Sequence, residues 1–220
     1  MAGILFIISA PSGSGKSTLV SETRRLVGGL DFSISYTTRQ PRGSEQDGVE
    51  YHFTTRAEFE RMIAAKEFLE WAEVFGNYYG TALSALDHAR ENGTDLLLDI
   101  DVQGALQVMK TMPKAVSIFI LPPSPEVLER RLRNRSQAEG VAEESVIERR
   151  LSQARTELLK LDDYRYALVN DVLDQAASEM RAIVLVARGA GDSADVALAA
   201  ECLTSQHSGR LDAALGTFGL

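Results

Sequence analysis

The chain has 220 residues, of which 45% are hydrophobic and 25% are charged, a balance typical of globular proteins that excludes the fibrous and disordered classes. Its formal net charge of −8 argues against a general affinity for nucleic-acid backbones, which require a positive protein surface. No segment approaches the roughly 20 apolar residues that a bilayer demands, and the single cysteine, Cys202, fits a reducing compartment. We therefore expect a cytoplasmic protein that binds neither nucleic acid nor membrane.

Short apolar runs alternate along the chain with stretches whose apolar residues have helical spacing. Continuous apolar runs indicate strands that are buried on both faces, and these are expected at residues 4–8, 95–100, 117–121 and 166–169. Helices are expected over residues 19–27, 82–90, 127–135, 145–159 and 176–186. This alternation predicts an α/β fold in which a parallel sheet forms the middle of three layers.

Two helix starts carry recognisable capping residues. Thr55 and Glu58 have the spacing of a capping box, so a further helix should begin there. Ser124 and Pro125 supply an N-cap and a first helical turn with a preset backbone angle, which predicts a helix beginning near Glu126.

Residues 33–81 interrupt the alternation and are expected to form an inserted lobe. They combine short β-like pieces around residues 32–36 and 68–75 with one helix and a polar loop at residues 40–48. The core of a domain spanning residues 1–188 would then consist of about residues 1–32, 82–135 and 150–188.

Two further segments stand apart from this core. Residues 136–144 are small, polar and acidic and lie between two arginine-bearing helices, which is typical of a mobile flap, so residues 136–149 are expected to form a small lid. The C-terminal extension at residues 189–220 is rich in Ala, Gly and Ser. A loosely attached tail and a short extra helix are both compatible with this composition.

A glycine-rich segment follows the first expected strand and opens the first expected helix. It consists of Ala10, Pro11, Ser12, Gly13, Ser14, Gly15, Lys16 and Ser17. In this context the segment predicts a P-loop, whose backbone N–H groups and helix N-terminus bind phosphate. Lys16 would reach the β and γ phosphates of ATP, and the Ser17 hydroxyl would ligate the accompanying Mg²⁺. Ala10 stands where the first glycine of the motif usually does, a position outside the phosphate-facing turn. The alternative interpretation of the whole segment is a flexible Gly/Ser turn.

Basic and phenolic side chains indicate a second phosphate site. Arg39 and Arg42 are three residues apart beside Pro41, so both guanidinium groups could fork onto one phosphate. Tyr51 and Tyr79 could each donate a hydrogen bond to it. The alternative is a solvated basic turn flanked by half-buried tyrosines.

Three carboxylates complete the pattern. Asp99 and Asp101 follow an apolar strand, as carboxylates near Mg²⁺ and the acceptor do in P-loop enzymes. Glu70 lies among apolar neighbours that would bury it, and a buried carboxylate needs a partner. Guanine offers adjacent N1–H and N2–H donors, whereas adenine does not, so Glu70 and Asp101 provide a route to selecting guanine.

With these residues in place, the chain resembles the guanylate kinases. The matching segments, which span roughly residues 4–187, are residues 9–18, Ser35, residues 37–42, Glu45, Tyr51 and residues 70–71, 77–81, 98–101, 103–104 and 169–171. The resemblance implies a P-loop core with an inserted nucleotide-monophosphate-binding lobe and a small helical lid. It also implies transfer of the γ-phosphate of ATP to GMP and dGMP with Mg²⁺, and it does not indicate an oligomeric state.

The resemblance also assigns roles to individual residues. ATP would be bound by Ala10, Pro11, Ser12, Gly13, Ser14, Gly15, Lys16, Ser17, Thr18, Arg131 and Asn170, with Asn170 at the adenine. GMP would be bound by Ser35, Arg39, Arg42, Glu45, Tyr51, Glu70, Tyr79, Gly80, Thr81, Asp99 and Asp101. In this set, the phosphate would be held by Arg39, Arg42, Tyr51 and Tyr79, and the guanine by Ser35, Glu70, Thr81 and Asp101. The catalytic residues would be Lys16, Arg39, Asp99 and the lid arginines Arg135 and Arg150.

Two other functions remain open from the residues themselves. A kinase of another phosphorylated acceptor, such as a ribose bisphosphate, could use the same scaffold but would not need Glu70 or Asp101. A non-catalytic module that binds protein partners is the second, although such modules tend to lose the phosphate loop, whereas Lys16 and Ser17 are present here.

Overall fold

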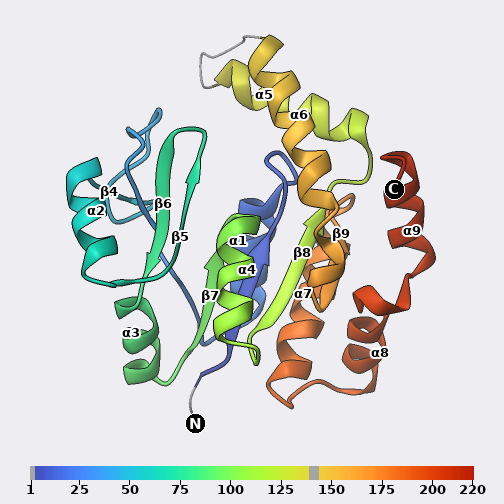
Figure 1. The fold of residues 1–220 in the computed structure, drawn as a ribbon. Coiled ribbons are helices and arrows are strands. Elements are labelled where there is room, and N and C mark those ends of the chain that lie inside the picture. The colour runs from blue at the N-terminus through green and yellow to red at the C-terminus, as the bar shows by residue number, and fades with distance from the viewer. Residues whose placement is uncertain (1–2, 139–143) are drawn as a thin grey trace. The chain divides into compact units, whose positions relative to one another are not determined.

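The computed structural model describes residues 3–138 and 144–220 (Figure 1). They form two compact units, the first from residues 3–7 and 29–115 and the second from residues 8–28, 116–138 and 144–220. Among the described residues, no helix combines the length and apolar character needed to cross a bilayer.

The larger sheet has five strands in the order β2-β7-β1-β8-β9, and β1 contributes residues to both units. The strands are β1 (Leu5–Ser9), β2 (Leu30–Phe32), β7 (Asp95–Asp99), β8 (Val116–Leu121) and β9 (Tyr166–Val169). In the first unit β2 pairs in parallel with β7, and in the second unit β8 pairs in parallel with β9. Most residues of these strands are buried, which explains their continuous apolar sequences. The predicted α/β class with a parallel sheet is confirmed.

The first unit also contains a four-stranded sheet with the order β4-β3-β6-β5. Its strands are β3 (Tyr36–Thr37), β4 (His52–Phe53), β5 (Phe68–Val74) and β6 (Asn77–Ala82). The antiparallel pair β5 and β6 is joined through Phe75 and Gly76, which both have positive φ angles of 52° and 79°. Two consecutive positive φ angles are what a tight hairpin turn requires. The turn therefore separates β5 from a second strand, β6, which the sequence pattern did not reveal.

Three helices belong to the first unit: α2 (Arg56–Ala64), α3 (Ser84–Asn92) and α4 (Val102–Thr111). The predicted cap of α2 is present, because the Thr55 hydroxyl accepts a hydrogen bond from the Glu58 N–H at 3.1 Å. Helix α3 begins two residues later than expected because Ala82 still belongs to β6. Helix α4 was not predicted, and it is capped by the Asp101 side chain.

The second unit surrounds its part of the parallel sheet with helices. They are α1 (Lys16–Leu26), α5 (Pro125–Ala138), α6 (Glu144–Leu158), α7 (Leu173–Ala187), α8 (Ser193–Glu201) and α9 (Gly209–Thr217), with short 3-10 turns η1 (Leu161–Asp163) and η2 (Thr204–Gln206). Helix α5 begins at Pro125, one residue before the predicted start near Glu126, and Ser124 lies at its N-terminus. Residues 139–143, which belong to the expected lid, lie outside the described residues.

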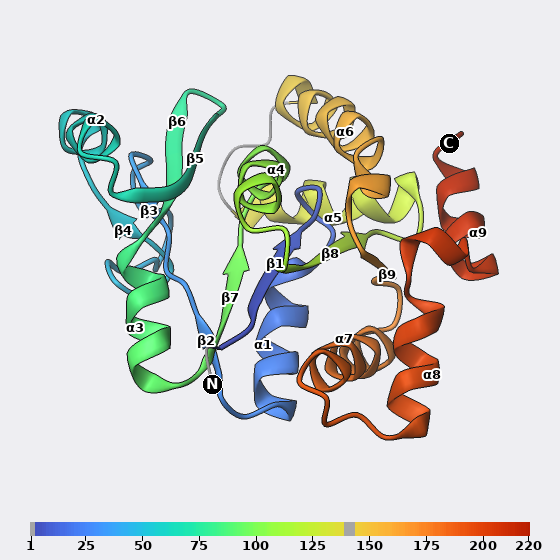
Figure 2. The ribbon, with the colours of Figure 1, turned by 60° about the horizontal axis from the view of Figure 1, so that its bottom comes forward.

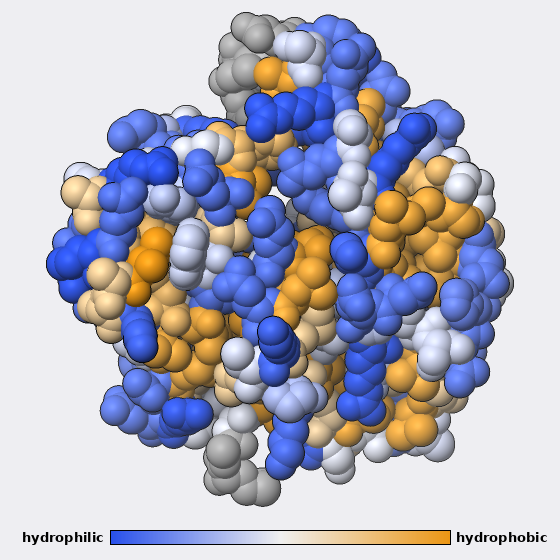
Figure 3. All heavy atoms as spheres, viewed as in Figure 1, coloured by the Kyte–Doolittle hydropathy of each residue, from blue (hydrophilic) through white to orange (hydrophobic). Residues whose placement is uncertain are grey.

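Residues 189–220 form α8, η2 and α9 within the second unit. Figures 1 and 2 both show α8 alongside α7, and the two helices are joined by the ion pair between Arg181 and Asp195 at 2.8 Å. The Ala167 N–H in β9 donates to the Cys202 carbonyl at 2.8 Å. Figure 3 shows hydrophobic side chains over α9, and Leu220 just beyond this helix is exposed.

Phe59 holds the four-stranded sheet to α2. Its ring is 0% exposed and stacks on Phe68 and Tyr78 with centroid distances of 4.3 and 5.2 Å. We expect Phe59→Ala to lower the free energy of unfolding by about 3–5 kcal/mol, because it removes a buried ring and leaves a cavity. Urea titration followed by circular dichroism measures the change. The control is Phe75→Ala, whose ring is 41% exposed and whose loss should cost under about 1 kcal/mol; equal costs would contradict the packing role of Phe59.

Candidate active site

The phosphate loop lies between the end of β1 and the start of α1. Gly13 and Gly15 have φ angles of 91° and 83°, in the left-handed region that favours glycine. A Cβ on Gly13 would lie 3.0 to 3.1 Å from Leu128 and Leu132 of α5. The glycines are therefore needed both for the turn and for its packing. Such a turn leaves backbone N–H groups available at a helix N-terminus, which is a favourable place for phosphate.

The carbonyl of Ser14 anchors this loop to two residues from distant parts of the chain. It accepts hydrogen bonds from Asn170 Nδ2 at 2.8 Å and from Arg131 Nη1 at 3.2 Å. Arg131 Nη2 also donates to the Asn170 carbonyl at 3.1 Å. A Cβ on Gly15 would lie 2.6 Å from Asn170 Nδ2, so the fit is tight. The structure thus brings together Ser14, Arg131 and Asn170, which the sequence had only suggested separately.

The remaining candidate donor-side residues lie on α1, α5 and α6. Lys16, Ser17 and Thr18 form the first turn of α1, where Ser17 and Thr18 are exposed and Lys16 is partly exposed. Arg135 is exposed on α5, and Arg150 of α6 donates to the buried Ser136 hydroxyl at 3.3 Å.

Arg133, also on α5, has a different environment from its neighbours. It is paired with Glu129 at 2.7 Å and with Glu144 at 2.6 Å, and these pairs connect α5 to the start of α6. Because its guanidinium is occupied by two carboxylates, Arg133 is a structural link between the helices rather than a candidate phosphate ligand.

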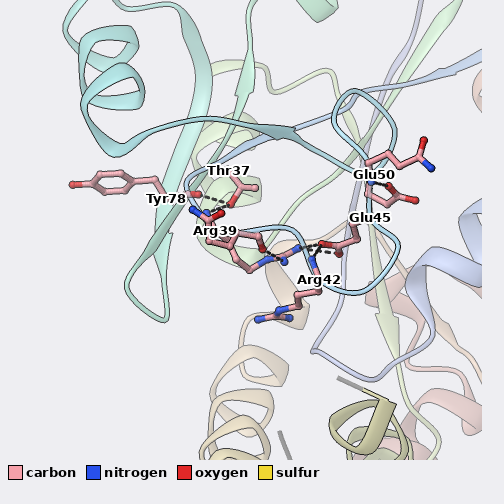
Figure 4. A network of polar contacts seen from close by, with 8 residues as sticks. Thr37, Arg39, Arg42, Glu45, Glu50 and Tyr78 are labelled. Atoms are coloured by element: carbon pink, nitrogen blue, oxygen red, sulfur yellow. Dashed lines mark hydrogen bonds and ion pairs between the residues drawn. The ribbon is translucent and has the colours of Figure 1, made fainter. Parts of the chain in front are cut away.

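In the first unit, Arg39 is held in a network of polar contacts (Figure 4). The side chain is 8% exposed, and its Nη2 donates to Glu45 at 2.9 Å while its Nη1 donates to the Gln40 carbonyl at 2.7 Å. The Arg39 N–H donates to the Thr37 hydroxyl at 3.1 Å. A buried guanidinium needs a counter-charge, and Glu45 supplies it.

The two arginines of this network contact Glu45 through different groups. The Arg42 N–H donates to the second oxygen of Glu45 at 2.8 Å, but Figure 4 shows its guanidinium pointing away from Glu45. Glu45 therefore orders both residues through different groups, the side chain of Arg39 and the main chain of Arg42.

Two tyrosines complete the surroundings of Arg39. Tyr51 and Tyr79 form an edge-to-face pair with a centroid distance of 5.9 Å, and the Arg39 guanidinium carbon lies 5.3 Å from the centroid of the Tyr51 ring. Burial alone would lower the pKa of Arg39, but Glu45 and Tyr79 outweigh it and raise the pKa. Four residues of the predicted GMP-binding set, Arg39, Glu45, Tyr51 and Tyr79, are thus neighbours.

Glu70 lies on β5 and is only 3% exposed. Burial raises its carboxyl pKa to about 7, and the charge of Asp101 adds to this, while Thr81 acts in the opposite direction. A Cβ on Gly104 of α4 would lie 2.2 Å from Glu70 Oε2, so glycine at this position makes room for the carboxylate. The Thr81 hydroxyl is buried, and among the described residues it makes no hydrogen bond of normal geometry.

The other predicted acceptor-side residues lie in or next to strands β3, β6 and β7. Ser35 is buried directly before β3, and its carbonyl accepts from the His52 N–H at 2.9 Å. Gly80 lies in β6, where a Cβ would be 2.9 Å from the Glu70 carbonyl. Asp99 is the partly exposed last residue of β7.

Asp101 has a structural task that the sequence analysis did not assign. Its Oδ1 accepts hydrogen bonds from the N–H groups of Gln103 and Gly104, at 2.8 and 3.2 Å, and thereby caps α4. This oxygen holds the helix that carries Gly104 against Glu70.

Sequence reasoning missed the positioning role of α4. Gln107 on this helix donates to the Trp71 carbonyl at 2.8 Å and so joins the helix to β5 beside Glu70. The signal was present, because Val102, Ala105 and Val108 are apolar at helical spacing behind an Asp that can cap.

A phosphate loop at the end of a parallel strand, together with a smaller mixed sheet that is followed by a buried arginine, is the organisation of the P-loop nucleoside monophosphate kinases, and the chain is a member of this class. A family model described as guanylate kinase matches residues 3–186. The chain belongs to the guanylate kinase family.

Individual relatives agree with this assignment. The guanylate kinase of Koribacter versatilis is 58% identical over 188 residues, which cover 86% of this chain and 80% of that protein. The guanylate kinase of Vibrio parahaemolyticus is 45% identical over 215 residues, which cover 97% and 98% of the two chains. A crystal structure of guanylate kinase from Anaplasma phagocytophilum matches with a TM-score of 0.66 at 33% identity, covering 84% of this chain and 86% of that one.

The raised pKa of Glu70 predicts a pH-dependent cost in stability. The unfolded carboxyl ionises near its ordinary value of 4.5, whereas the folded one stays protonated up to about pH 7. The free energy of unfolding should therefore fall as the pH rises between these values. Glu70→Gln cannot ionise and should be more stable than the wild type at pH 8, by about 1–3 kcal/mol, with a smaller difference at pH 5.

Urea unfolding at both pH values measures this difference. Glu67→Gln is the matched control, because Glu67 is exposed and Arg61 lowers its carboxyl pKa, so its replacement should not reproduce the gain at pH 8. If Glu70→Gln and the wild type lose stability in parallel between pH 5 and 8, the carboxyl pKa of Glu70 is not raised.

Proposed function

We propose that the chain carries out its family's reaction, transfer of the γ-phosphate of ATP to GMP to give ADP and GDP. Membership of the guanylate kinase family supports this activity. The observation that carries the substrate assignment is the buried Glu70 carboxylate, for which Gly104 makes room. A carboxylate kept away from water gains most from a ligand that offers two adjacent N–H donors, as the guanine edge does.

On the donor side, the phosphate loop and Lys16 would hold the triphosphate, with Asn170 beside the adenine. The anchoring of Ser14 by Asn170 and Arg131 supports this, because a phosphate loop must keep its N–H groups oriented before the nucleotide arrives. Arg135 and Arg150 would add positive charge at the transferred phosphoryl group.

A magnesium ion fits the same place. The exposed Ser17 hydroxyl in the first turn of α1 is a hard oxygen ligand of the kind that Mg²⁺ takes together with nucleotide phosphates. Ser17 would hold the ion together with the nucleotide phosphates, and the ion would supply positive charge that offsets the negative charge developing during phosphoryl transfer.

On the acceptor side, Arg39, Arg42, Tyr51 and Tyr79 would hold the GMP phosphate. The phosphate would compete with Glu45 for the buried Arg39 guanidinium, so that one anion replaces another next to the same cation. Guanine would then be bound by Glu70, with Ser35, Thr81 and Asp101 around it. The buried Thr81 hydroxyl, which lacks a normally oriented partner in the described chain, supports a ligand at this position.

The reaction itself would be an in-line displacement. An oxygen of the GMP phosphate forms a bond to the γ-phosphorus of ATP while the bond from that phosphorus to the β,γ-bridging oxygen breaks, and ADP leaves. Lys16, Arg39 and the lid arginines would stabilise the developing charge, and Asp99 would lie near the acceptor. We expect closure of the GMP-binding lobe to exclude water, because water would otherwise accept the phosphoryl group.

This proposal places the protein in the cytoplasm, where both nucleotides are available. Two other functions were considered from the sequence. A kinase of a different phosphorylated acceptor leaves the buried Glu70 unexplained. A non-catalytic binding module leaves the ordered phosphate loop unexplained.

Acceptor choice tests the substrate assignment. ADP release from ATP should be fast with GMP, measurable with dGMP, and much slower with AMP, CMP, UMP or no acceptor. Glu70→Gln should raise KM for GMP by about tenfold or more, since one of two charge-assisted hydrogen bonds weakens, with KM for ATP within about twofold. A strong preference of the wild type for another acceptor would overturn the assignment to GMP.

Removal of the loop lysine tests the donor side. Lys16→Ala should reduce kcat by at least about 10²–10³-fold, because the developing phosphoryl charge loses a direct cationic partner. The far-ultraviolet circular dichroism spectrum and the unfolding midpoint should be nearly unchanged, since Lys16 is partly exposed rather than in the core. Lys114→Ala, at an exposed residue between α4 and β8, is the control and should retain full turnover. Near-normal kcat in Lys16→Ala would refute the role.

A further inference from the structure

Arg210 lies on α9, beyond the residues 3–186 that the family model covers. Its guanidinium bridges two elements of the second unit. Nη1 is paired with Glu179 of α7, and Nη2 donates to the Val169 carbonyl at the end of β9 at 2.6 Å. The C-terminal extension therefore reaches back to the last residue of β9, the edge strand of the parallel sheet.

Val169 directly precedes Asn170, which contacts the phosphate loop. Asn170 donates from its side chain to the Ser14 carbonyl, and its N–H donates to the Leu121 carbonyl of β8 at 2.8 Å. Arg210 and Leu121 thus bind the carbonyl and the N–H of the peptide group that joins Val169 to Asn170 in one short turn. A continuous set of hydrogen bonds runs from Glu179 through Arg210 and the Val169–Asn170 turn to Ser14.

Other contacts of the extension act on the same edge of β9 but further from this turn. The Ala167 N–H donates to the Cys202 carbonyl, and Tyr166 pairs with Leu203 in an isolated antiparallel bridge. These bonds cover the beginning of the strand, and Arg210 covers its end. The extension therefore supplies hydrogen-bond partners along an otherwise open sheet edge.

We propose that Arg210 is a positioning residue for the donor nucleotide site, acting through the Val169 carbonyl on Asn170 and the phosphate loop. The inference rests on the proposed contact between Asn170 and the adenine of ATP. According to this proposal, the C-terminal extension contributes to the ATP site, although Arg210 itself does not contact the nucleotide.

The chemistry of the pair suits this task. Glu179 is buried, and burial raises its carboxyl pKa, while Arg210 and Gln175 act in the opposite direction. A guanidinium held by a carboxylate on one side keeps its remaining N–H groups in a fixed plane, so the bond to Val169 is directional. A flexible lysine could supply the charge but not two bonds in one plane.

The chain contains a matched control for this arrangement. Arg181 of α7 also ties the extension to this helix, through an ion pair with Asp195 of α8 at 2.8 Å, but within the described part of the chain it makes no hydrogen bond to the Val169–Asn170 turn. The side chains of Arg181 and Arg210 are similarly exposed, at 42% and 33%. Loss of either arginine should loosen the extension, whereas only loss of Arg210 should disturb the turn.

Steady-state kinetics with the full chain tests the proposal. Arg210→Met should raise KM for ATP by roughly fivefold or more, since a charge-assisted hydrogen bond that orders the turn is lost, with KM for GMP within about twofold. Arg181→Met should change both KM values by less than about twofold. Arg210→Lys should recover only part of the affinity for ATP, because lysine lacks the planar fork.

Two further variants keep the result interpretable. Arg210→Met leaves the buried Glu179 with Gln175 as its remaining partner and could unfold the chain. The double variant Arg210→Met with Glu179→Gln removes this unpaired charge. It should show the same selective rise in KM for ATP. Asn170→Ala tests the underlying donor role and should itself raise KM for ATP.

The outcomes separate the two claims. If Asn170→Ala raises KM for ATP and the folded Arg210 variants do not, the positioning role is refuted and the donor role of Asn170 stands. If Asn170→Ala leaves KM for ATP unchanged, the proposed adenine contact fails and this inference fails with it. Equal changes in Arg210→Met and Arg181→Met would show a general effect of loosening the extension, which also overturns the proposal.

Discussion

The hydrogen bond from Asn170 to the Ser14 carbonyl is the constraint on which the second unit depends. A loop that directs its N–H groups toward phosphate has carbonyls that must find donors elsewhere, because buried unpaired carbonyls are costly. Ser14 finds two, from Asn170 and Arg131. Through them the end of β9 and helix α5 are tied to a loop more than a hundred residues earlier in the chain. The tight fit of Gly15 against Asn170 and of Gly13 against α5 shows that packing and hydrogen bonding impose the same loop conformation.

The first unit depends on buried charge. Arg39 is balanced by Glu45 within hydrogen-bonding distance, whereas Glu70 is kept in a site where ionisation is unfavourable. Without a ligand, these buried ionisable side chains lower the free energy of unfolding. Such a loss of stability is typical of binding sites, where the ligand supplies the hydrogen-bond or charge partner that the protein lacks. Helix α4 is part of this arrangement, because Asp101 caps it, Gly104 leaves space for the carboxylate, and Gln107 joins it to β5. The surroundings of Glu70 are thus shaped by a helix whose own sequence carries little obvious chemistry.

Much of the framework could be predicted from local patterns. The continuous apolar runs located four strands of the parallel sheet to within a residue or two, and Thr55, Ser124 and Pro125 marked helix starts that the structure contains. Elements without such patterns were missed. Strand β6 was hidden because its hairpin turn uses Phe75 with a positive φ angle, which no local rule favours for a phenylalanine, and α4 followed Asp101 too closely to be separated from the carboxylate motif. The composition of residues 189–220 left two alternatives open, since the contacts that join them to α7 and β9 involve residues distant in the chain.

Neighbouring residues and short spacings encode the phosphate loop, the parallel sheet and the set of acidic and basic side chains, so these could be read from the amino-acid order. Which of those side chains meet depends on how the chain folds. Arg39 is paired with Glu45, whereas the Arg42 side chain points away from Glu45. Asp101 caps α4. Arg133 is paired with Glu129 and Glu144. Arg210 joins the last helix to the turn before Asn170 across some forty residues of chain. Such pairings depend on burial and distance in the folded chain, and a linear pattern contains neither.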